Sequence, residues 1–326
     1  MTTLAAIGVL SSLGYPLGSS CQAPTKVMAT PIRQHLLTRR SNPQYRQQLI
    51  SAEGLTLNWQ TLKPSLCVTG DKRLSQLTVQ LSQRTQALVC EDQRFLVIGG
   101  DHSLAMGSWS GVIQAMEQRK NLSSNSKTDL SHHKSDFGLI WIDAHLDAHS
   151  FTSSPSGNIH GMPLHALLGD TDPRLNQFCP AAGKLQGENL QLIGIRDYEQ
   201  PELNFLTDHR AKIHFMSDTP SGDCTDTLMA AMQDLCSRCD TVGISIDMDA
   251  IDPSQAPGVA TPVNKGLNLD SLCEALKQIA RNKQFVGLEI CEFDPSKDQH
   301  QITLNAVAKL ICAAFVAPES RETLFH

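Results

Sequence analysis

Aspartate and histidine alternate in residues 143–149, which read DAHLDAH. The apolar residues 137–142 directly precede them and have the length and composition of a buried strand. Alternate side chains of an extended chain point to the same side, so Asp143, His145 and Asp147 can converge. Carboxylates held this close repel one another unless a cation lies between them. A divalent metal ion is the simplest such cation.

Two further segments have the same form. The apolar residues 95–100 lead into His102, and residues 241–246 lead into Asp247 and Asp249. Open parallel sheets bind ligands outside the carboxyl ends of their strands, where several strand ends meet. We therefore expect the three segments to bring their polar residues to one place.

The candidate ligands number six, four carboxylates and two imidazoles: His102, Asp143, His145, Asp147, Asp247 and Asp249. This set is too large for one tetrahedral zinc ion and too rich in oxygen for a thiolate site. It suits two hard, roughly octahedral ions that share bridging carboxylates. The first choice is two Mn²⁺ per chain, with other divalent ions as alternatives.

Composition limits the class of protein. A chain of 326 residues with 40% hydrophobic and 18% charged residues can bury one large α/β core. A net charge of -6 argues against a nucleic-acid surface and is compatible with a small or cationic substrate. The longest apolar runs fall well short of the ~18 residues of a membrane span, which excludes one. The apolar residues 1–10 lack a basic leader, so we expect a first strand, not a signal peptide, in a cytoplasmic protein.

Predicted strands and helices alternate along the chain. Besides the strands already named, apolar runs predict strands at residues 55–59, 190–195, 213–216 and 286–290, and periodicity predicts helices at 71–91, 104–120, 223–237, 268–281 and 303–315. This order predicts a three-layer α/β/α fold with a mostly parallel, doubly wound sheet, as one domain spanning residues 1–326. The polar residues at about 120–136, with His132 and His133, have no periodicity and predict a surface loop.

The ten cysteines include a single CxxC pair, Cys236 and Cys239. Such a pair can be redox-active or bind zinc, but ordinary reduced thiols are favoured in a cytoplasmic protein. We predict no structural disulfide, and the role of this pair stays open.

Three motifs together resemble a known family. The sequences GGDHS (99–103), DAHLD (143–147) and SIDMDAIDPSQAPG (245–258) are similar, in order and spacing, to the signatures of the ureohydrolase family, which contains arginase and agmatinase. The resemblance extends from about residue 7 to residue 312, and SGNIHG (156–161) further resembles arginase. It implies a small guanidino substrate and a homotrimer or homohexamer.

The resemblance also implies a role for each residue. The ligands of one ion match His102, Asp143, Asp147 and Asp247, and those of the other match Asp143, His145, Asp247 and Asp249. Divalent ions lower the pKa of bound water from about 15.7 toward neutrality, so a metal-bridging hydroxide is expected to attack the guanidino carbon. L-Arginine would give L-ornithine and urea. Beside the ligand Asp147, the implied catalytic residues are His160 as proton shuttle and Glu292, which orients the guanidinium.

The residues that match substrate-binding positions follow the family's pattern less closely than the metal ligands do. Ser156 and Asn158 match residues that bind the α-carboxylate, and Thr261 matches a residue of the pocket wall. Glu199 stands where an aspartate usually meets the α-ammonium, and His149 stands where an asparagine is usual. These two departures leave the exact guanidino substrate open. The alternatives are another amidinohydrolase, acting on agmatine, guanidinobutyrate or an N-substituted arginine, and a catalytically silent regulatory relative, against which the complete ligand set argues.

Three further acids of these motifs, Asp101, Asp197 and Asp252, are interpreted as turn residues or as partners that orient the ligands. A metal-dependent deacetylase shares the broad architecture but would need a single-zinc site. The number of bound ions therefore separates the two classes.

Overall fold

The computed structural model describes residues 2–15, 19–29, 55–65, 71–124, 137–169, 172–219 and 221–316. Eight strands of this part form one sheet in the order β2-β1-β3-β8-β7-β4-β5-β6, and every neighbouring pair is parallel. The strands are β1 (Thr2–Val9), β2 (Leu55–Leu62), β3 (Phe95–Ile98), β4 (Phe137–Ile142), β5 (Leu190–Ile195), β6 (Lys212–Phe215), β7 (Thr241–Asp247) and β8 (Phe285–Cys291). The predicted parallel sheet is therefore confirmed.

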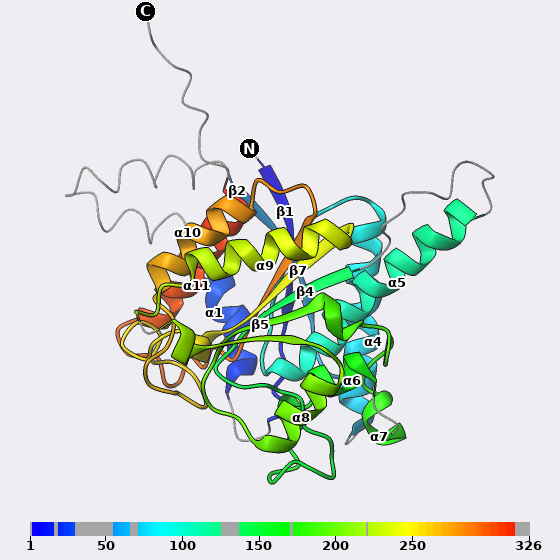
Figure 1. The fold of residues 1–326 in the computed structure, drawn as a ribbon. Coiled ribbons are helices and arrows are strands. Elements are labelled where there is room, and N and C mark those ends of the chain that lie inside the picture. The colour runs from blue at the N-terminus through cyan, green and yellow to red at the C-terminus, as the bar shows by residue number, and fades with distance from the viewer. Residues whose placement is uncertain are drawn as a thin grey trace, which may run out of the picture.

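Helices cover both faces of this sheet (Figure 1). One face packs against α1 (Ala23–Ala29), α9 (Thr225–Arg238), α10 (Leu269–Ile279) and α11 (Ile302–Phe315). The other packs against α4 (Asp71–Cys90), α5 (Ala105–Ser124), α6 (Pro163–Leu168) and α7 (Pro173–Asn176). The short α8 (Gln200–Asp208) follows β5. Strands covered on both sides read as continuous apolar runs, which is why β3, β4 and β5 are buried at every position.

The register of the central strands places their carboxyl ends level with one another. Ile142 of β4 pairs with Ile246 of β7, and Asp247 pairs with Cys291 of β8. Ile98 of β3 pairs with Ile290 on the other side of β8. The residues that directly follow β3, β4, β7 and β8 consequently lie at one edge of the sheet.

The helices α4 and α5 lie against each other on the outer layer. Thr85 Oγ1 donates to the Ser108 carbonyl at 3.0 Å, and Ser82 Oγ donates to Gln114 Oε1 at 2.9 Å. At the crossing, α5 presents Gly111, and a methyl group there would lie 2.0 Å from Thr85 Oγ1 and 2.2 Å from the Ser82 carbonyl oxygen. The absence of a side chain at Gly111 therefore sets the close approach of the two helices.

Some elements differ from the sequence-based expectation. Helix α5 continues to Ser124, so the first residues of the polar stretch expected at 120–136 are helical, and residues 125–136, with His132 and His133, lie outside the described part of the chain. Helices α1, α6, α7 and α8 were not expected. In this part of the chain, no helix is long and apolar enough to cross a membrane.

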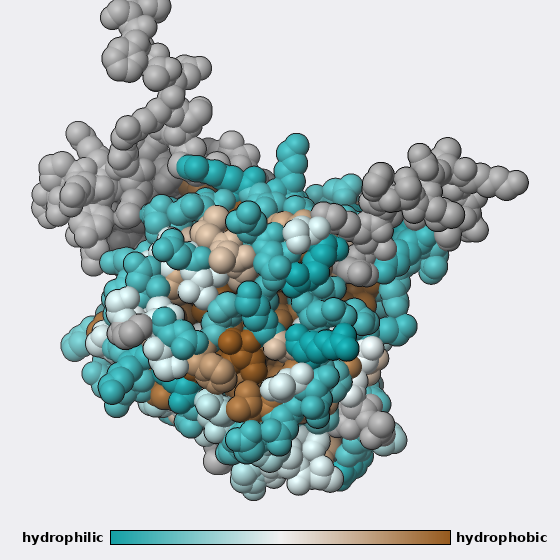
Figure 2. Space-filling model, in the orientation of Figure 1, coloured by the Kyte–Doolittle hydropathy of each residue, from teal (hydrophilic) through white to brown (hydrophobic). Residues whose placement is uncertain are grey.

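Polar residues dominate the face of the molecule shown in Figure 2, with a smaller group of hydrophobic residues near its centre. Nine of the cysteines are described, and all nine are free thiols. Asn282 Nδ2 lies 3.3 Å from Cys236 Sγ, while Cys239 is buried against Leu235 and Gly138. Cys67 lies outside the described residues.

Candidate metal centre

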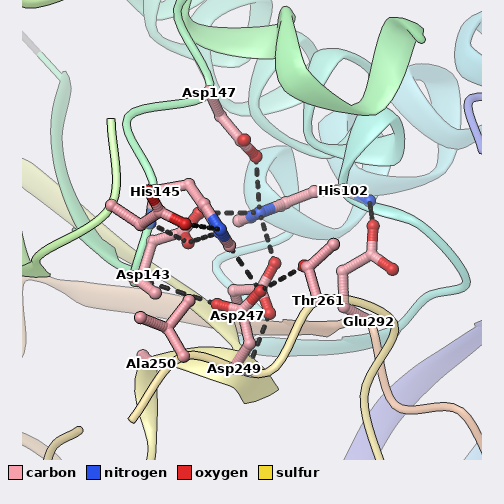
Figure 3. A network of polar contacts seen from close by, with 12 residues as sticks. His102, Asp143, His145, Asp147, Asp247, Asp249, Ala250, Thr261 and Glu292 are labelled. Carbon is pink, nitrogen blue, oxygen red and sulfur yellow. Dashed lines mark hydrogen bonds and ion pairs between the residues drawn. The ribbon is translucent and has the colours of Figure 1, made fainter. Parts of the chain in front are cut away.

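The three predicted strand ends meet at the carboxyl edge of the sheet (Figure 3). His102 follows β3, the residues from Asp143 to Asp147 follow β4, and Asp247 and Asp249 lie at the end of β7. Between β3 and β7 runs β8, which delivers Glu292 to the same place. Residues about 190 positions apart in the chain are thereby in contact, since the His102 backbone N–H donates to Glu292 Oε1 at 3.0 Å.

The first of two acid–histidine groups surrounds His102. Its Nδ1 atom lies 3.2 Å from Asp143 Oδ2, 3.1 Å from Asp147 Oδ2 and 3.2 Å from Asp247 Oδ2. One ligand atom from each of the four residues lies within 4.8 Å of all the others, and all four residues are buried.

A divalent ion fits this group. The buried His102 Nδ1 atom makes no hydrogen bond with any residue that the structure describes, although three carboxylate oxygens surround it. First-row divalent ions lie about 2.0–2.2 Å from such ligand atoms, so neighbouring ligand atoms of one ion are about 3 Å apart. The three distances from His102 Nδ1 to the carboxylate oxygens, 3.1–3.2 Å, agree with this spacing. An ion bound there would satisfy an otherwise unpaired nitrogen and offset three negative charges.

The second group consists of Asp143, His145 and Asp249. His145 Nδ1 lies 3.2 Å from Asp249 Oδ2 and 3.5 Å from Asp143 Oδ1. Asp143 therefore points one oxygen into each group, which is the arrangement of a bridging carboxylate. Asp247, which was expected to bridge as well, has an oxygen in the first group only, and its Oδ1 accepts the Asp249 backbone N–H at 2.8 Å.

Partners that the sequence analysis did not identify hold these ligands from behind. Trp141 Nε1 donates to Asp143 Oδ2 at 2.9 Å, and its ring stacks on His102 with centroids 3.9 Å apart. His102 Nε2 lies 3.0 Å from Ser245 Oγ, which donates to Glu289 Oε2 at 2.8 Å. In this series of hydrogen bonds His102 Nε2 carries the proton, so Nδ1, which faces the carboxylates, has the free lone pair that a metal ligand needs. Ser245 and Glu289 are buried polar residues within apolar strands, and this is the signal that could have revealed them.

The ionisation of the groups reflects the crowding. Burial raises the pKa of Asp147 to about 6, with the charge of Asp143 acting in the same direction. Burial and then the charges of Asp249 and Asp143 raise the pKa of Asp247 well above its usual range. Burial opposes protonation of His145, but Asp249 and Asp143 outweigh it, so the pKa of His145 is raised. In the absence of a metal ion, protons therefore occupy part of this site.

Beside the first group, His160 is paired with Glu292. His160 Nδ1 lies 3.2 Å from Glu292 Oε1, and burial is outweighed by this hydrogen bond and charge, so the pKa of His160 rises to about 9. His160 also packs against Tyr15, with ring centroids 4.7 Å apart. The second carboxylate oxygen of Glu292, Oε2, is buried and makes no hydrogen bond with the described residues.

Two of these site residues have strained backbones. The φ angle is +47° at Asp147 and +61° at Glu292, a region that is uncommon for residues other than glycine, although asparagine, aspartate and histidine adopt it more often than the rest. Such strain persists only where the surrounding structure imposes it, and it concentrates at functional sites. At Asp147 it accompanies a carboxylate that lies 3.1 Å from His102 Nδ1, and at Glu292 one that accepts the His102 backbone N–H at 3.0 Å (Figure 3).

The residues expected to contact the substrate lie at two places. Thr261 Oγ1 donates to Asp249 Oδ2 at 2.9 Å, beside the second group. His149 Nε2 lies 2.7 Å from Glu199 Oε2 and 3.2 Å from Glu202 Oε2, so it is bound to acids of the α8 N-terminus. Ser156 is exposed and Asn158 half-buried in the loop before His160. None of these five residues belongs to either of the two groups at the strand ends.

The three other acids of the motifs orient their surroundings. Asp101 is buried and accepts the Gly14 backbone N–H at 3.1 Å, which holds the end of β1 beside the site. Asp197 Oδ2 lies 3.8 Å from His145 Nε2. Asp252 accepts the backbone N–H groups of Ser254 and Gly266 in a turn.

A doubly wound sheet that holds two acid–histidine groups sharing one carboxylate defines an enzyme of the binuclear metal amidinohydrolase type. The chain belongs to the Arginase family, whose family model matches residues 14–317. The ureohydrolase membership that the motifs predicted is thereby confirmed. The arginase of Bacillus caldovelox is 34% identical over 252 residues, which are 76% of this chain and 78% of that protein.

Solved structures agree with this assignment. The crystal structure of arginase from Bacillus subtilis matches with a TM-score of 0.77 and 26% identity, covering 96% of this chain and 98% of that chain. Formimidoylglutamase from Bacillus subtilis subsp. subtilis str. 168 matches with a TM-score of 0.72 and 25% identity, covering 96% of this chain and 86% of that chain. The fold is therefore shared by relatives whose names denote different substrates.

Proposed function

We propose that this protein hydrolyses the guanidino group of L-arginine to L-ornithine and urea, with two Mn²⁺ ions per chain. The observation that carries the proposal is Oε2 of Glu292, which is buried and makes no hydrogen bond with the described residues. The other oxygen of this carboxylate contacts His160 and the backbone N–H of the candidate ligand His102. A buried carboxylate oxygen without a hydrogen-bond donor costs free energy of desolvation, and a guanidinium N–H is a donor of opposite charge. Relatives named arginase support the choice of substrate.

Two divalent ions, when bound in the centre, supply hydroxide at neutral pH by lowering the pKa of water. Glu292 accepts from the guanidinium and fixes the position of its carbon. His160, whose Nδ1 is held by Glu292, has Nε2 available to give a proton to the amine as the carbon–nitrogen bond breaks. With a pKa raised to about 9, His160 is protonated at neutral pH and can act as this acid.

The α-amino acid end of the substrate is proposed to meet Ser156 and Asn158, which lie on the exposed loop that leads to His160. His149 and Glu199 belong to the same proposed subsite. Because His149 and Glu199 are bound to each other at 2.7 Å, part of the negative charge that would attract an α-ammonium is already offset. This contact favours a second candidate, an amidinohydrolase whose substrate lacks the α-ammonium group, such as guanidinobutyrate.

Urea release from a panel of guanidino compounds tests the proposal. With Mn²⁺ supplied, we expect kcat/KM for L-arginine to exceed that for agmatine by at least about 10², or roughly 2.7 kcal/mol. A pocket that pairs with a carboxylate penalises a ligand without one, because its own donors stay unpaired. Equal or faster hydrolysis of agmatine or guanidinobutyrate would replace arginine as the proposed substrate. Absence of urea from every compound would remove the amidinohydrolase proposal itself.

The remaining expectations belong to the same proposal. The choice of Mn²⁺ rests on the oxygen-rich ligand set, which hard ions prefer. We further propose a homotrimer or homohexamer in the cytoplasm, and a single domain over residues 1–326. Elemental analysis tests the choice of Mn²⁺, and the mass of the particle in solution tests the oligomeric state.

A further inference from the structure

Arg196, which directly follows β5, uses its whole guanidinium to bind backbone carbonyls beside the metal centre. Its donors and acceptors are Nε to Asn264 at 3.1 Å, Nη1 to Gly194 and Ala250 at 3.1 Å each, and Nη2 to Asp249 and Val263 at 2.7 Å each. An arginine has five N–H donors in a rigid planar fork, and here each donor has a carbonyl. Arg196 is thus bound to the backbone of the metal-centre residue Asp249.

The backbone of Arg196 binds the other segment of the second group. The N–H groups of Arg196 and Asp197 donate to the Ala144 carbonyl at 2.9 and 3.0 Å. Ala144 lies between Asp143 and His145 in the chain. A single residue therefore joins the turn after β4 to the turn after β7, and these two turns supply all three side chains of the second group.

The same side chain also fixes the Thr261 loop, defined here as residues 259–266. Apart from one isolated bridge, at Val259, this loop has no helix or strand. Thr261 reaches from it to the carboxylate of Asp249, and Figure 3 shows Ala250 on the same turn as Asp249. Because Arg196 binds the carbonyls of Val263 and Asn264 as well as those of Asp249 and Ala250, it ties the loop to the turn.

We propose that Arg196 is a positioning residue that assembles the metal position formed by Asp143, His145 and Asp249. The positive charge of Arg196, taken alone, would weaken metal binding at this position. Arg196 faces the carboxylates of Asp249 and Asp143, and a cation there repels an incoming divalent ion. Replacement of Arg196 therefore weakens metal binding if the hydrogen bonds of its guanidinium dominate. It strengthens metal binding if the repulsion between its positive charge and the ion dominates.

Titration of the metal-free protein with Mn²⁺, by calorimetry and by the electron paramagnetic resonance of free Mn²⁺, separates the two effects. The variants are Arg196→Met, which removes charge and fork, and Arg196→Lys, which keeps the charge and loses the fork. Arg94→Met is the matched control. Arg94 is also partly buried and binds two carbonyls, of Ala280 and Asn282, but at the start of β3, away from the centre.

We expect one of the two Mn²⁺ ions to bind about 10–100-fold more weakly in both Arg196 variants, as for the loss of other partners that orient ligands. The other ion should change less than about threefold. Arg94→Met should lower thermal stability and leave both affinities unchanged. Equal weakening of both ions, tighter binding in Arg196→Met, or wild-type affinity in Arg196→Lys would each overturn the inference.

Assignment of the weakened ion uses Asp249→Asn, which disables the second position directly. Adding Arg196→Lys to Asp249→Asn should leave the remaining Mn²⁺ affinity unchanged, since both changes act on one position. A further loss in the double variant would overturn the assignment. The inference rests on the two metal positions of the proposed function, but these titrations contain no substrate. Wild-type protein that binds a single Mn²⁺ would refute the proposed centre itself, whereas two ions with unselective losses would refute the role of Arg196 alone.

Discussion

His160 carries protons in the proposed mechanism and lies outside both acid–histidine groups. We expect His160→Asn to lower kcat for urea release by about 10²–10⁴, the usual contribution of a general acid or base. Both Mn²⁺ ions should remain bound, because the His160 ring contacts Glu292 and Tyr15 and none of the six candidate ligands. Steady-state urea assays and elemental analysis of the same sample check the two statements.

His209→Asn is a suitable control for this experiment, since His209 ends α8 and its Nδ1 contacts the Phe205 carbonyl. The control should retain both turnover and metal. If His160→Asn lost an ion, His160 would have to join the ligands. If it kept full turnover, another group would have to carry the proton.

At the scale of single residues, the sequence predicted which side chains meet, because the position of each one at the end of an apolar strand can be read from its neighbours in the sequence. Each candidate ligand follows a buried parallel strand, so the sheet alone brings them to one edge. The residues that orient them could not be predicted in this way. Glu289 is connected to His102 by hydrogen bonds through Ser245. Arg196 binds backbone carbonyls, and no sequence pattern distinguishes an arginine that does so from other arginines. The pairing of His149 with Glu199 likewise depends on how α8 packs.

At the scale of elements, long buried strands and long amphipathic helices were predictable, and short helices were not. The strands β4 and β5 have the predicted bounds, because both faces of each are covered and the runs are apolar except for the buried Gln191 of β5. Helices of seven, six and nine residues, namely α1, α6 and α8, are too short to show a clear period. Their stability comes from tertiary packing and from caps, such as the reciprocal bonds between Glu199 and Glu202 at the start of α8.

The contact between α4 and α5 makes a prediction about stability. In Gly111→Ala the new methyl group would overlap Thr85 Oγ1 and the Ser82 carbonyl, so the helices must move apart. Overpacking of this kind costs about 1–3 kcal/mol, which exceeds the gain of about 1 kcal/mol in helix propensity at the upper end of that range. We expect a net loss of up to about 2 kcal/mol and, for a chain of this length, a fall in Tm of about 1.5 °C per kcal/mol.

Thermal unfolding of Gly111→Ala beside Gln83→Ala measures this effect. Gln83 is exposed on α4, so its replacement changes helix propensity without touching α5. Gln83→Ala should leave Tm unchanged or raise it slightly. An unchanged or higher Tm in Gly111→Ala would show that the helix pair has room at this crossing, contrary to the packing described above.

At the scale of the whole molecule, the fold buries several carboxylates close together, where loss of water destabilises their charged form. Four aspartates of the centre, Asp143, Asp147, Asp247 and Asp249, are buried at one edge of the sheet. Desolvation of so many carboxylates opposes folding unless protons or metal ions offset their charge. Binding of ions to the folded chain therefore contributes to stability. An ion present at 100 times its Kd adds about 2.7 kcal/mol, and two add roughly twice that.

The sign of the pH dependence follows from Asp147. In the metal-free protein its pKa is raised to about 6 by burial and by Asp143, so the folded chain binds this proton more tightly than the unfolded chain does. The resulting stability is fully present below about pH 4 and is lost as the pH rises through 6. A bound ion needs the ionised carboxylate. Below pH 6 the proton therefore competes with the ion, at a cost of about 1.4 kcal/mol for each pH unit.

We therefore expect the difference in Tm between Mn²⁺-loaded and chelator-treated protein to increase from pH 5 to pH 8, at a fixed concentration of free Mn²⁺. Differential scanning calorimetry at three or four pH values measures it directly. Gly111→Ala is the control, because it lowers both values of Tm at a site far from the centre and should leave their difference and its pH dependence intact. At pH 8 two ions at 100 times their Kd stabilise the fold by about 5 kcal/mol, which is roughly 7 °C for a chain of this length. At pH 5 the competing proton on Asp147 removes part of that gain. A difference that stays constant or shrinks with rising pH would mean that the ions bind without displacing protons, and that Asp147 is not among their ligands.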